Sequence, residues 1–345
     1  MKKVGIIYGG TSTEHEVSKM SAKSVIEKLN KEKYEIKQIF IDTDGKWYNA
    51  DENKKHEITN ITEELKKLDL VFPILHGKYG EDGTIQGMLE ILKVPYVGCK
   101  VLASSVGMDK VYTKIVFEKA GIPQAPYVYI KKQNGEYKII TENFEEEELS
   151  LVKITSKLKF PMFVKPSNSG SSVGVKKANN IEELEKAIEN AGQYDSKILV
   201  EQGIDGKEVE CAILELKGKD VDCSISDREN KCDVLASTVG EIMSAEEFYS
   251  FDAKYNIPES KTIIPAKIEE TQMEEIRKLA VKAFKAIDGS GLSRVDFFIE
   301  NGTNKIYINE INTMPGFTKI SMYPKLFESV GIGYSDLLDK LIENA

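Results

Sequence analysis

The sequence contains no long apolar run. Its hydrophobic segments stay well short of the roughly 18 residues that a membrane-spanning helix needs. The first residues, MKKVGIIYGGTSTEHE, have a basic tip followed by only about five apolar residues, which is too few for a signal peptide. We therefore expect no membrane partner and a cytoplasmic location.

Cysteine and histidine are also scarce, and the 56 acidic residues outnumber the 47 basic ones. The four cysteines, Cys99, Cys211, Cys223 and Cys232, show no CxxC spacing, and only three histidines could join them in a metal site. This pattern favours free, reduced thiols over zinc binding. The net charge of −9 argues against nucleic acid as a partner, although it leaves room for a local positive pocket that binds a nucleotide.

The first part of the chain alternates strand and helix patterns. Its 345 residues are enough for two or three domains. We expect strands at 3–8, 35–41 and 68–75, with helices at 14–29 and 84–92. Such alternation over about the first 100 residues predicts an α/β fold with a doubly wound parallel sheet. One further helix is expected at 108–120, where Gly121 and Pro123 end it.

The rest of the chain is richer in strands. Strands are expected at 127–132, 161–165 and 197–201, and helices at 181–190, 271–287 and 334–342. The apolar stripe of the helix at 271–287 is interpreted as core. The acidic stretch at 145–148 is interpreted as a solvated surface or a helix start.

A doubled two-residue spacing near the C-terminus is the most informative feature. Arg294 and Asp296 lie in one expected strand, and Glu310 and Asn312 lie in the next. Asn301-Gly302 predicts a hairpin turn between them, and alternation places each pair on one face of its strand. Carboxylate and amide oxygens suit Mg²⁺ or Mn²⁺, which usually handle phosphates. A solvated hairpin edge is the alternative, but the apolar neighbours of these acids favour a partner.

The run VKPSNSGSSVGV at 164–175 has the composition of a phosphate cradle. Lys165 leaves an apolar strand, and small residues follow it, so backbone N–H groups and hydroxyls could approach an anion. It does not match the Walker pattern GxxxxGK[ST]. A flexible serine and glycine turn is the alternative interpretation.

Two further segments fit a nucleotide enzyme. Glu201 ends a strand, and with Glu208 it could meet an adenine amino group or ribose hydroxyls; both could equally be surface charges. The polar segment at about 240–264 holds four aromatic residues, which favours a lid over disorder.

A nicotinamide-dependent oxidoreductase is a competing hypothesis. Gly9 and Gly10 follow the first strand, and Asp42 ends the second as a candidate ribose acceptor. However, the third glycine of GxGxxG is missing, and Asp42 lies farther along the chain than the roughly 20 residues expected. Glu14, by contrast, stands where a helix begins and is expected to point into the ligand crevice.

Taken together, the chain resembles the ATP-grasp superfamily and, within it, the D-alanine–D-alanine ligases. The resemblance rests on nine segments in order: GGTSTEHEVS, PILHGKYGEDGTIQGMLE, VGMDK, VKPSNSGSSVGV, the 201–208 segment, DAKY, RVDFF, NEINTMPGFT and SMYP. It implies a Rossmann-like domain at 1–105, a central ATP-grasp subdomain at 106–200 and a C-terminal subdomain at 201–345 with the lid. The phosphate loop departs slightly from the common wording at Asn168 and Ser169.

The resemblance also implies a set of nucleotide-binding residues. Two Mg²⁺ ions, or Mn²⁺, would bridge the phosphates of ATP through Asp296, Glu310 and Asn312. The phosphates would be bound by two lysines and a small-residue loop: Lys110, Lys165, Gly170, Ser171 and Ser172. The adenine would contact Glu201 and Ile204, and the ribose would contact Glu208.

The same resemblance implies how two D-alanines would bind and react. Glu14 would orient the first D-alanine with His76 nearby, and Glu14, Ser171 and Tyr255 would form a hydrogen-bonded bridge. Ser321, Met322 and Lys254 would receive the second D-alanine. The first carboxylate would attack the γ-phosphorus to give an acyl phosphate, and the amine of the second would then attack the acyl carbon. Arg294 and the Gly316 N–H would stabilise the oxyanion.

Several alternatives stay open at this point. Relatives of the same fold that use D-lactate or D-serine differ in the lid or the second subsite, and DAKY is similar to the dipeptide-forming type. An ATP-binding protein without catalysis is disfavoured because the metal ligands and Arg294 are all present. The family resemblance also implies a homodimer.

Overall fold

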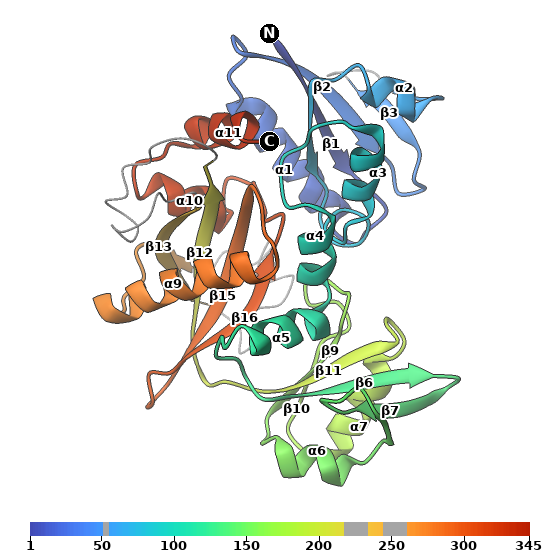
Figure 1. Ribbon diagram of the computed structural model, residues 1–345, viewed down its shortest axis with the longest axis vertical. Helices are drawn as coiled ribbons and strands as arrows, with labels where there is room; N and C mark the ends of the chain where they lie inside the picture. Colours follow the sequence, from blue (N-terminus) through green and yellow to red (C-terminus); the bar gives the residue numbers. More distant parts are fainter. Residues whose placement is uncertain (51–54, 217–233, 244–260) are drawn as a thin grey trace.

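The computed structural model describes residues 1–50, 55–216, 234–243 and 261–345. Three sheets, each with its own helices, make up the described part of the chain (Figure 1). None of the helices formed by these residues is both long and apolar enough to cross a membrane. The domain limits at 105 and 200 stay a prediction.

The first sheet has the order β4-β3-β2-β1-β5. Its parallel centre is formed by β1 (Lys2–Gly9), β2 (Tyr34–Ile41) and β5 (Leu70–Ile74), as the alternation predicts. The apolar runs of β1 and β5 are buried because a parallel sheet is covered on both faces. Unforeseen strands β3 (Trp47–Ala50) and β4 (Lys55–Glu57) extend one edge antiparallel. The helices of this region are α1 (His15–Lys28), α2 (Ile61–Leu65) and α3 (Thr84–Leu92).

The helix expected at 108–120 is present as α5 (Lys110–Lys119). A preceding helix, α4 (Val101–Met108), was not predicted, and Asp109 separates the two in an extended conformation. The Asp109 carboxylate accepts a hydrogen bond from the backbone N–H of Tyr112 and so caps α5. This break sets Lys110 at the first turn of α5.

The second sheet is antiparallel throughout, in the order β10-β9-β11-β6-β7-β8. Its strands are β6 (Tyr127–Gln133), β7 (Glu136–Ile140), β8 (Glu146–Glu148), β9 (Met162–Pro166), β10 (Lys176–Ala178) and β11 (Lys197–Gln202), with α6 (Leu151–Lys157) and α7 (Ile181–Ala191). The acidic stretch does not start a helix; it forms edge strand β8, with Glu146 and Glu148 exposed. Charge on an edge strand opposes pairing with another chain.

The third sheet has the order β14-β13-β12-β15-β16. Its strands are β12 (Gly206–Glu215), β13 (Val234–Met243), β14 (Lys261–Ile263), β15 (Leu292–Glu300) and β16 (Ile306–Asn312), with α9 (Glu270–Ala286), α10 (Met322–Glu328) and α11 (Tyr334–Glu343). The stripe of α9 is core, as predicted: Ile276, Ala280, Ala283 and Phe284 are buried. Of the predicted lid, 240–243 end β13 and 261–263 form β14. Residues 244–260 lie outside the described residues.

One hydrophobic core joins the two ends of the chain. It contains Val4 and Phe72 from the first sheet together with Phe317, Tyr323 and Leu341 from the C-terminal region. In Figure 1, α11 accordingly lies beside α1. This shared core fixes the first sheet against the third and holds the loops between them in place.

Candidate functional site

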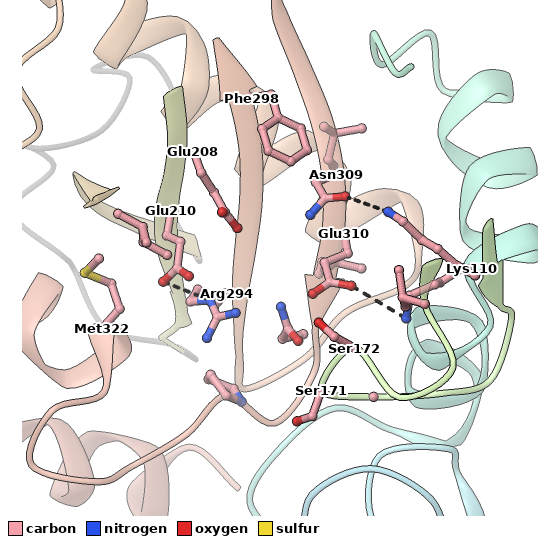
Figure 2. A pocket seen from close by; sticks show the side chains of 18 of the residues that line it. Lys110, Ser171, Ser172, Glu208, Glu210, Arg294, Phe298, Asn309, Glu310 and Met322 are labelled. Carbon is pink, nitrogen blue, oxygen red and sulfur yellow. Dashed lines mark hydrogen bonds and ion pairs between the residues drawn. The ribbon is translucent and has the colours of Figure 1, made fainter. Parts of the chain in front are cut away.

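A cleft of about 590 Å³ is lined by residues from all three sheet regions. Nearly every predicted site residue within the described ranges lines it: Glu14, His76, Lys110, Lys165, Gly170, Ser171, Ser172, Glu201, Ile204, Glu208, Arg294, Glu310, Asn312, Gly316, Ser321 and Met322. Figure 2 shows many of these side chains converging. Asp296 is buried behind this lining, and Lys254 and Tyr255 lie outside the described residues.

The hairpin of β15 and β16 forms the floor of the cleft. As predicted, the strands are antiparallel, with Asp296 opposite Glu310 and Arg294 opposite Asn312. The register shifts just after Asp296, so these two pairs lie on one side of a β-bulge. Asn312 Nδ2 donates to Asp296 Oδ2 at 3.0 Å, so the amide oxygen of Asn312 is turned away from that carboxylate.

Arg294 is held by two carboxylates. Its Nε and one terminal nitrogen each lie 2.7 Å from an oxygen of Asp296, and Nε lies 3.1 Å from Oε2 of Glu210. Burial lowers the pKa of Arg294, but Asp296 and Glu210 outweigh this and raise the pKa well above its usual value. The guanidinium is thus a fixed positive charge in the cleft (Figure 2).

The donor set fits a hard divalent cation. Asp296, Glu310 and Asn312 carry carboxylate and amide oxygens, which are the ligand type that Mg²⁺ and Mn²⁺ prefer. Both Asp296 oxygens accept hydrogen bonds here, from Arg294 and Asn312. Within the described ranges, no group of three His, Cys, Asp or Glu side chains could hold a metal ion. The predicted set of two carboxylates and one amide would leave further positions to phosphate oxygens and water.

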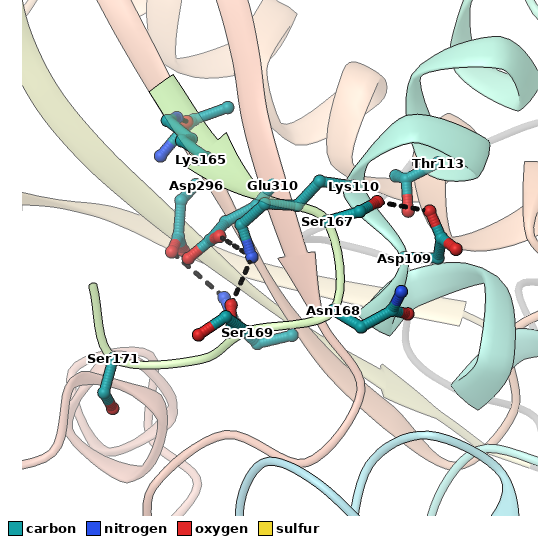
Figure 3. Close-up of polar contacts among 12 residues, drawn as sticks. Asp109, Lys110, Thr113, Lys165, Ser167, Asn168, Ser169, Ser171, Asp296 and Glu310 are labelled. Carbon is teal, nitrogen blue, oxygen red and sulfur yellow. Dashed lines mark hydrogen bonds and ion pairs between the residues drawn. The ribbon is translucent and has the colours of Figure 1, made fainter. Parts of the chain in front are cut away.

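The loop after β9 is arranged as an anion cradle. Lys110 Nζ donates to the carbonyl of Ser169 at 2.9 Å and lies 3.6 Å from Oε2 of Glu310, so it joins the loop to β16 (Figure 3). Ser171 and Ser172 both have positive φ, at 46° and 61°. Non-glycine residues in this region are strained, and such strain concentrates at functional sites. Asn168 and Ser169, where the loop differs from the common family sequence, make hydrogen bonds that stabilise the loop. Asn168 donates to Asp195, and Ser169 donates to the carbonyl of Val173.

Glu201 is a buried carboxylate shared by two lysines. Lys165 Nζ lies 2.8 Å from one oxygen, and Lys114 Nζ lies 2.5 Å from the other. Burial raises the pKa of Glu201, but the two lysines together bring it below its usual value. Burial likewise lowers the pKa of Lys165, while Glu201 and then Glu310 and Glu208 raise it. Lys165 is therefore positively charged and is surrounded by the three acidic residues Glu201, Glu208 and Glu310.

The first sheet contributes Glu14 and His76. Ser171 donates a short hydrogen bond to Glu14, which is the first half of the bridge that the resemblance implies. His76 is buried, with Nε2 3.0 Å from Ser21 Oγ and Nδ1 3.3 Å from Glu81 Oε1. Burial lowers the pKa of His76, but Glu81, by hydrogen bond and charge, and Glu14 raise it above its usual value.

The loop before α10 closes the opposite end of the cleft. Ser321 precedes α10, and its hydroxyl oxygen accepts a hydrogen bond from the backbone N–H of Thr318 at 2.9 Å. Met322 follows it and is buried. A Cβ at Gly316 would lie 2.8 Å from Ser321 Oγ, so the glycine allows these two loop positions to approach.

Within the part of the chain that the structure describes, Asp42, Gly9 and Gly10, the residues of the dinucleotide-binding hypothesis, have no shared binding site. Asp42 accepts hydrogen bonds from the backbone of Asp44 and Lys46 and from the hydroxyl of Tyr48. It therefore stabilises the turn after β2. Gly9 and Gly10 have positive φ, and they line a separate cavity of about 300 Å³ that Asp42 does not line.

Three charged residues of the cleft region were missed from the sequence. Glu210 follows Glu208 by two positions on β12, and this same-face spacing could have identified it. Lys114 follows Lys110 by one helical turn, which is a weaker signal. Glu81 lies in the same loop as His76, and an irregular loop has no periodic spacing that could have identified their pairing.

Comparison with known proteins gives a consistent result. The family model "D-ala D-ala ligase N-terminus" matches residues 3–99, and "D-ala D-ala ligase C-terminus" matches 116–343. D-alanine–D-alanine ligase of Acetivibrio thermocellus is 47% identical, covering 100% of this chain and 96% of the relative. The enzyme of the same name from Clostridium novyi is 43% identical, covering 100% and 98%.

Solved structures agree with these matches. The VanG D-Ala:D-Ser ligase of Enterococcus faecalis has a TM-score of 0.82 at 35% identity, covering 99% of this chain and 98% of that one. The Bacillus anthracis D-alanine–D-alanine ligase complexed with ATP has a TM-score of 0.76 at 30% identity, covering 100% and 97%. The three-sheet architecture is thus the ATP-grasp arrangement expected from the sequence, and the chain belongs to the D-alanine–D-alanine ligase family.

Proposed function

We propose that this protein joins two D-alanines to D-alanyl-D-alanine with ATP, through a D-alanyl phosphate, and releases ADP and phosphate. The dipeptide would serve as a peptidoglycan precursor. The observation that carries the proposal is the convergence of a hard-cation donor set, a fixed arginine and a lysine-bearing anion loop in one cleft. Family membership supports the substrate assignment.

Nucleotide binding is assigned to the side of the cleft between the second and third sheets. Lys110, Lys165 and the loop with Gly170, Ser171 and Ser172 hold the phosphates. Glu201 and Ile204 meet the adenine, and Glu208 meets the ribose. The charged state of Lys165 and the adjacency of Lys110 to Glu310 support this assignment. ATP in the related Bacillus anthracis structure supports the ligand class.

Asp296, Glu310 and Asn312 would hold two Mg²⁺ ions, or Mn²⁺. When bound, these ions offset phosphate charge during phosphoryl transfer. Glu310→Gln removes one anionic ligand, so we expect a higher Mg²⁺ concentration for half-maximal activity. Titration of activity with Mg²⁺ measures this, and an unchanged midpoint would remove Glu310 from the metal site.

The first D-alanine is placed near Glu14 and His76, where the Glu14 carboxylate suits its ammonium group. We assign the second to Ser321 and Met322, which line the cleft, and to Lys254. Arg294 and the Gly316 N–H then donate to the oxyanion that forms when the amine attacks the acyl phosphate. Tyr255 would complete the bridge from Glu14 and Ser171 and exclude water from the acyl phosphate.

Product identification tests this function. Purified protein receives ATP, Mg²⁺ and equal amounts of D-alanine, D-lactate and D-serine, and products are identified by mass. We expect D-alanyl-D-alanine as the main product and little turnover with L-alanine. Phosphate release that does not depend on D-alanine would contradict the proposal.

A D-alanine–D-serine ligase is the second candidate. The observation that favours it is the 0.82 TM-score with the VanG D-Ala:D-Ser ligase. The curated relatives, at 43–47% identity, carry the dipeptide ligase name and favour the first candidate. The same mixed-substrate assay separates the two, because D-alanyl-D-serine has a different mass.

We further propose a homodimer and a cytoplasmic location. The cytoplasmic location is supported by the proposed use of ATP, because the cytoplasm is where ATP is available as a substrate. Light scattering of the purified protein tests the dimer by the mass of the particle relative to one chain, and cell fractionation tests the location.

A further inference from the structure

Lys114 is a buried lysine to which the proposed mechanism gives no task. It lies on α5, about one turn after Lys110, and its side chain is 4% exposed. Its Nζ lies 2.5 Å from Glu201 Oε1 and 3.5 Å from the carbonyl oxygen of Ala125. Because a buried ammonium group needs an anionic partner, this geometry ties Lys114 to Glu201.

Glu201 is thereby paired twice, once on each oxygen. Lys114 occupies Oε1, while Lys165 lies 2.8 Å from Oε2 and 3.5 Å from Asn309 Oδ1. The Lys165 side chain is more exposed, at 15%, and it lines the cleft, whereas Lys114 does not. One of the two lysines can therefore turn to an incoming anion, and only Lys165 is placed to do so.

We propose that Lys114 is a positioning residue that keeps Glu201 paired while Lys165 turns to the phosphates of the nucleotide. This inference rests on the proposed function, which assigns Lys165 to phosphate and Glu201 to adenine. Without Lys114, the movement of Lys165 would leave a buried carboxylate with no cation. Breaking a buried ion pair in this way is strongly unfavourable, so phosphate binding would be opposed.

The charges around Glu201 give the proposal a pH signature. The groups that face it are Lys114 from α5, Lys165 from β9 and Tyr127 from β6, whose ring centroid lies 5.3 Å from Lys114 Nζ; Glu208 and Glu310 act on Lys165 from the third sheet. When neither lysine remains on Glu201, burial is unopposed and this carboxylate takes up a proton. A variant without Lys114 should therefore bind phosphate-bearing nucleotides more weakly as pH rises.

Calorimetric titration of Lys114→Met with a non-hydrolysable ATP analogue and with adenosine tests this. We expect the dissociation constant of the analogue to rise about 10- to 100-fold, because the movement of Lys165 now breaks the last buried pair. Adenosine does not draw Lys165 away, so its affinity should change far less. The dissociation constant of the analogue for the variant, divided by that for the wild type, should increase with pH. Titration of the analogue's own phosphates affects both proteins equally and cancels in this ratio. Lys119→Met, an exposed lysine of the same helix, is the matched control and should change neither constant.

A second comparison uses a double variant in which Glu201 no longer carries a charge. Glu201→Gln removes the charge that would be left unpaired, so adding Lys114→Met to it should change analogue affinity little and abolish the pH effect. A further loss of about tenfold in the double variant overturns the proposal. Equal losses for adenosine and analogue, or a pH-independent ratio, would show that Lys114 only supports the fold. Ligation of D-alanine by the wild type is measured separately, so its failure would contradict the proposed function and not this inference.

Discussion

At the residue scale, Arg294 has two tasks. It neutralises Asp296 and Glu210, which are 2% and 4% exposed, and it presents positive charge to the cleft. The sequence indicated only the second task, because Glu210 is brought to Arg294 by the pairing of β12 with β15. Any substitution of Arg294 thus affects stability as well as chemistry.

Arg294→Ala should lower turnover far more than ATP affinity, because its interaction with the oxyanion strengthens only as the reaction proceeds. It should also reduce the free energy of unfolding by about 3–5 kcal/mol, since two buried carboxylates lose the guanidinium that lies between them. Kinetics and denaturant unfolding measure both effects. The control is Arg277→Ala, whose partner Glu274 is half-exposed and stays solvated, so it should lose less. Equal losses of turnover and ATP affinity would instead mean that Arg294 holds phosphate.

Glu81→Gln should lower the pKa of His76. Burial lowers that pKa in the wild type, and the hydrogen bond and charge of Glu81 are the largest influences that raise it. Because the folded pKa is raised, protonated His76 contributes stability that is fully present below about pH 6.5 and lost as pH rises through the raised value. NMR titration of the three histidines measures the change. An unchanged His76 titration would show that Glu81 does not control it.

At the element scale, the loop after β9 is anchored from three directions. Lys110 on α5 holds Ser169, Glu14 before α1 accepts from Ser171, and Asp195 before β11 holds Asn168. The loop is thus held by the start of α5, by the segment before α1 of the first sheet region and by the segment before β11 of the second sheet. Sequence composition identified the loop as an anion cradle but could not identify these anchors, which come from distant segments.

Gly170→Ala should weaken the first D-alanine subsite. A Cβ at this position would lie 2.5 Å from Glu14 Oε2, so the Glu14 carboxylate must move. We expect the KM for D-alanine at the first subsite to rise several-fold, with a smaller effect on ATP, as steady-state kinetics would measure. Gly87→Ala is the matched control: nothing lies within 4 Å of its Cβ, and alanine in a helix should be neutral or stabilising by up to about 1 kcal/mol. Equal effects on both substrates would contradict the role of Glu14.

At the scale of the whole molecule, the cleft is assembled from all three sheet regions. The core shared by Val4, Phe72 and Phe317 fixes the first sheet to the third, while α5 and the loop after β9 bring in the second. A ligand in the cleft therefore contacts parts of the chain that are far apart in sequence. Its binding is coupled to the integrity of the whole fold.

A saturating ATP analogue should accordingly stabilise the entire molecule. At a concentration about 100 times its dissociation constant, the free energy of unfolding should rise by about 2.7 kcal/mol, and the unfolding temperature should rise with it. Thermal unfolding with D-alanine added should show a further increase that L-alanine does not produce. An analogue that leaves the transition unchanged would argue against a nucleotide site in this cleft.

The sequence by itself determined the local elements and the chemical character of the cleft. Alternation in LSRVDFFIE and NKIYINEIN fixed which side chains share a face, because strand periodicity is a local property. The parallel centre of the first sheet and the core stripe of α9 were equally readable. Helix α4, which ends just before Asp109, was not predicted, and the Asp109 carboxylate that caps α5 separates the two helices.

Only the tertiary structure decided which charges meet. Lys114 with Glu201 and Glu210 with Arg294 are pairs whose members come from different elements. Residue type shows that a buried charge needs a partner, but the packing of strands and helices selects that partner. For this reason the sequence predicted a cleft for ATP and metal, and the structure revealed the ion pairs that position its residues.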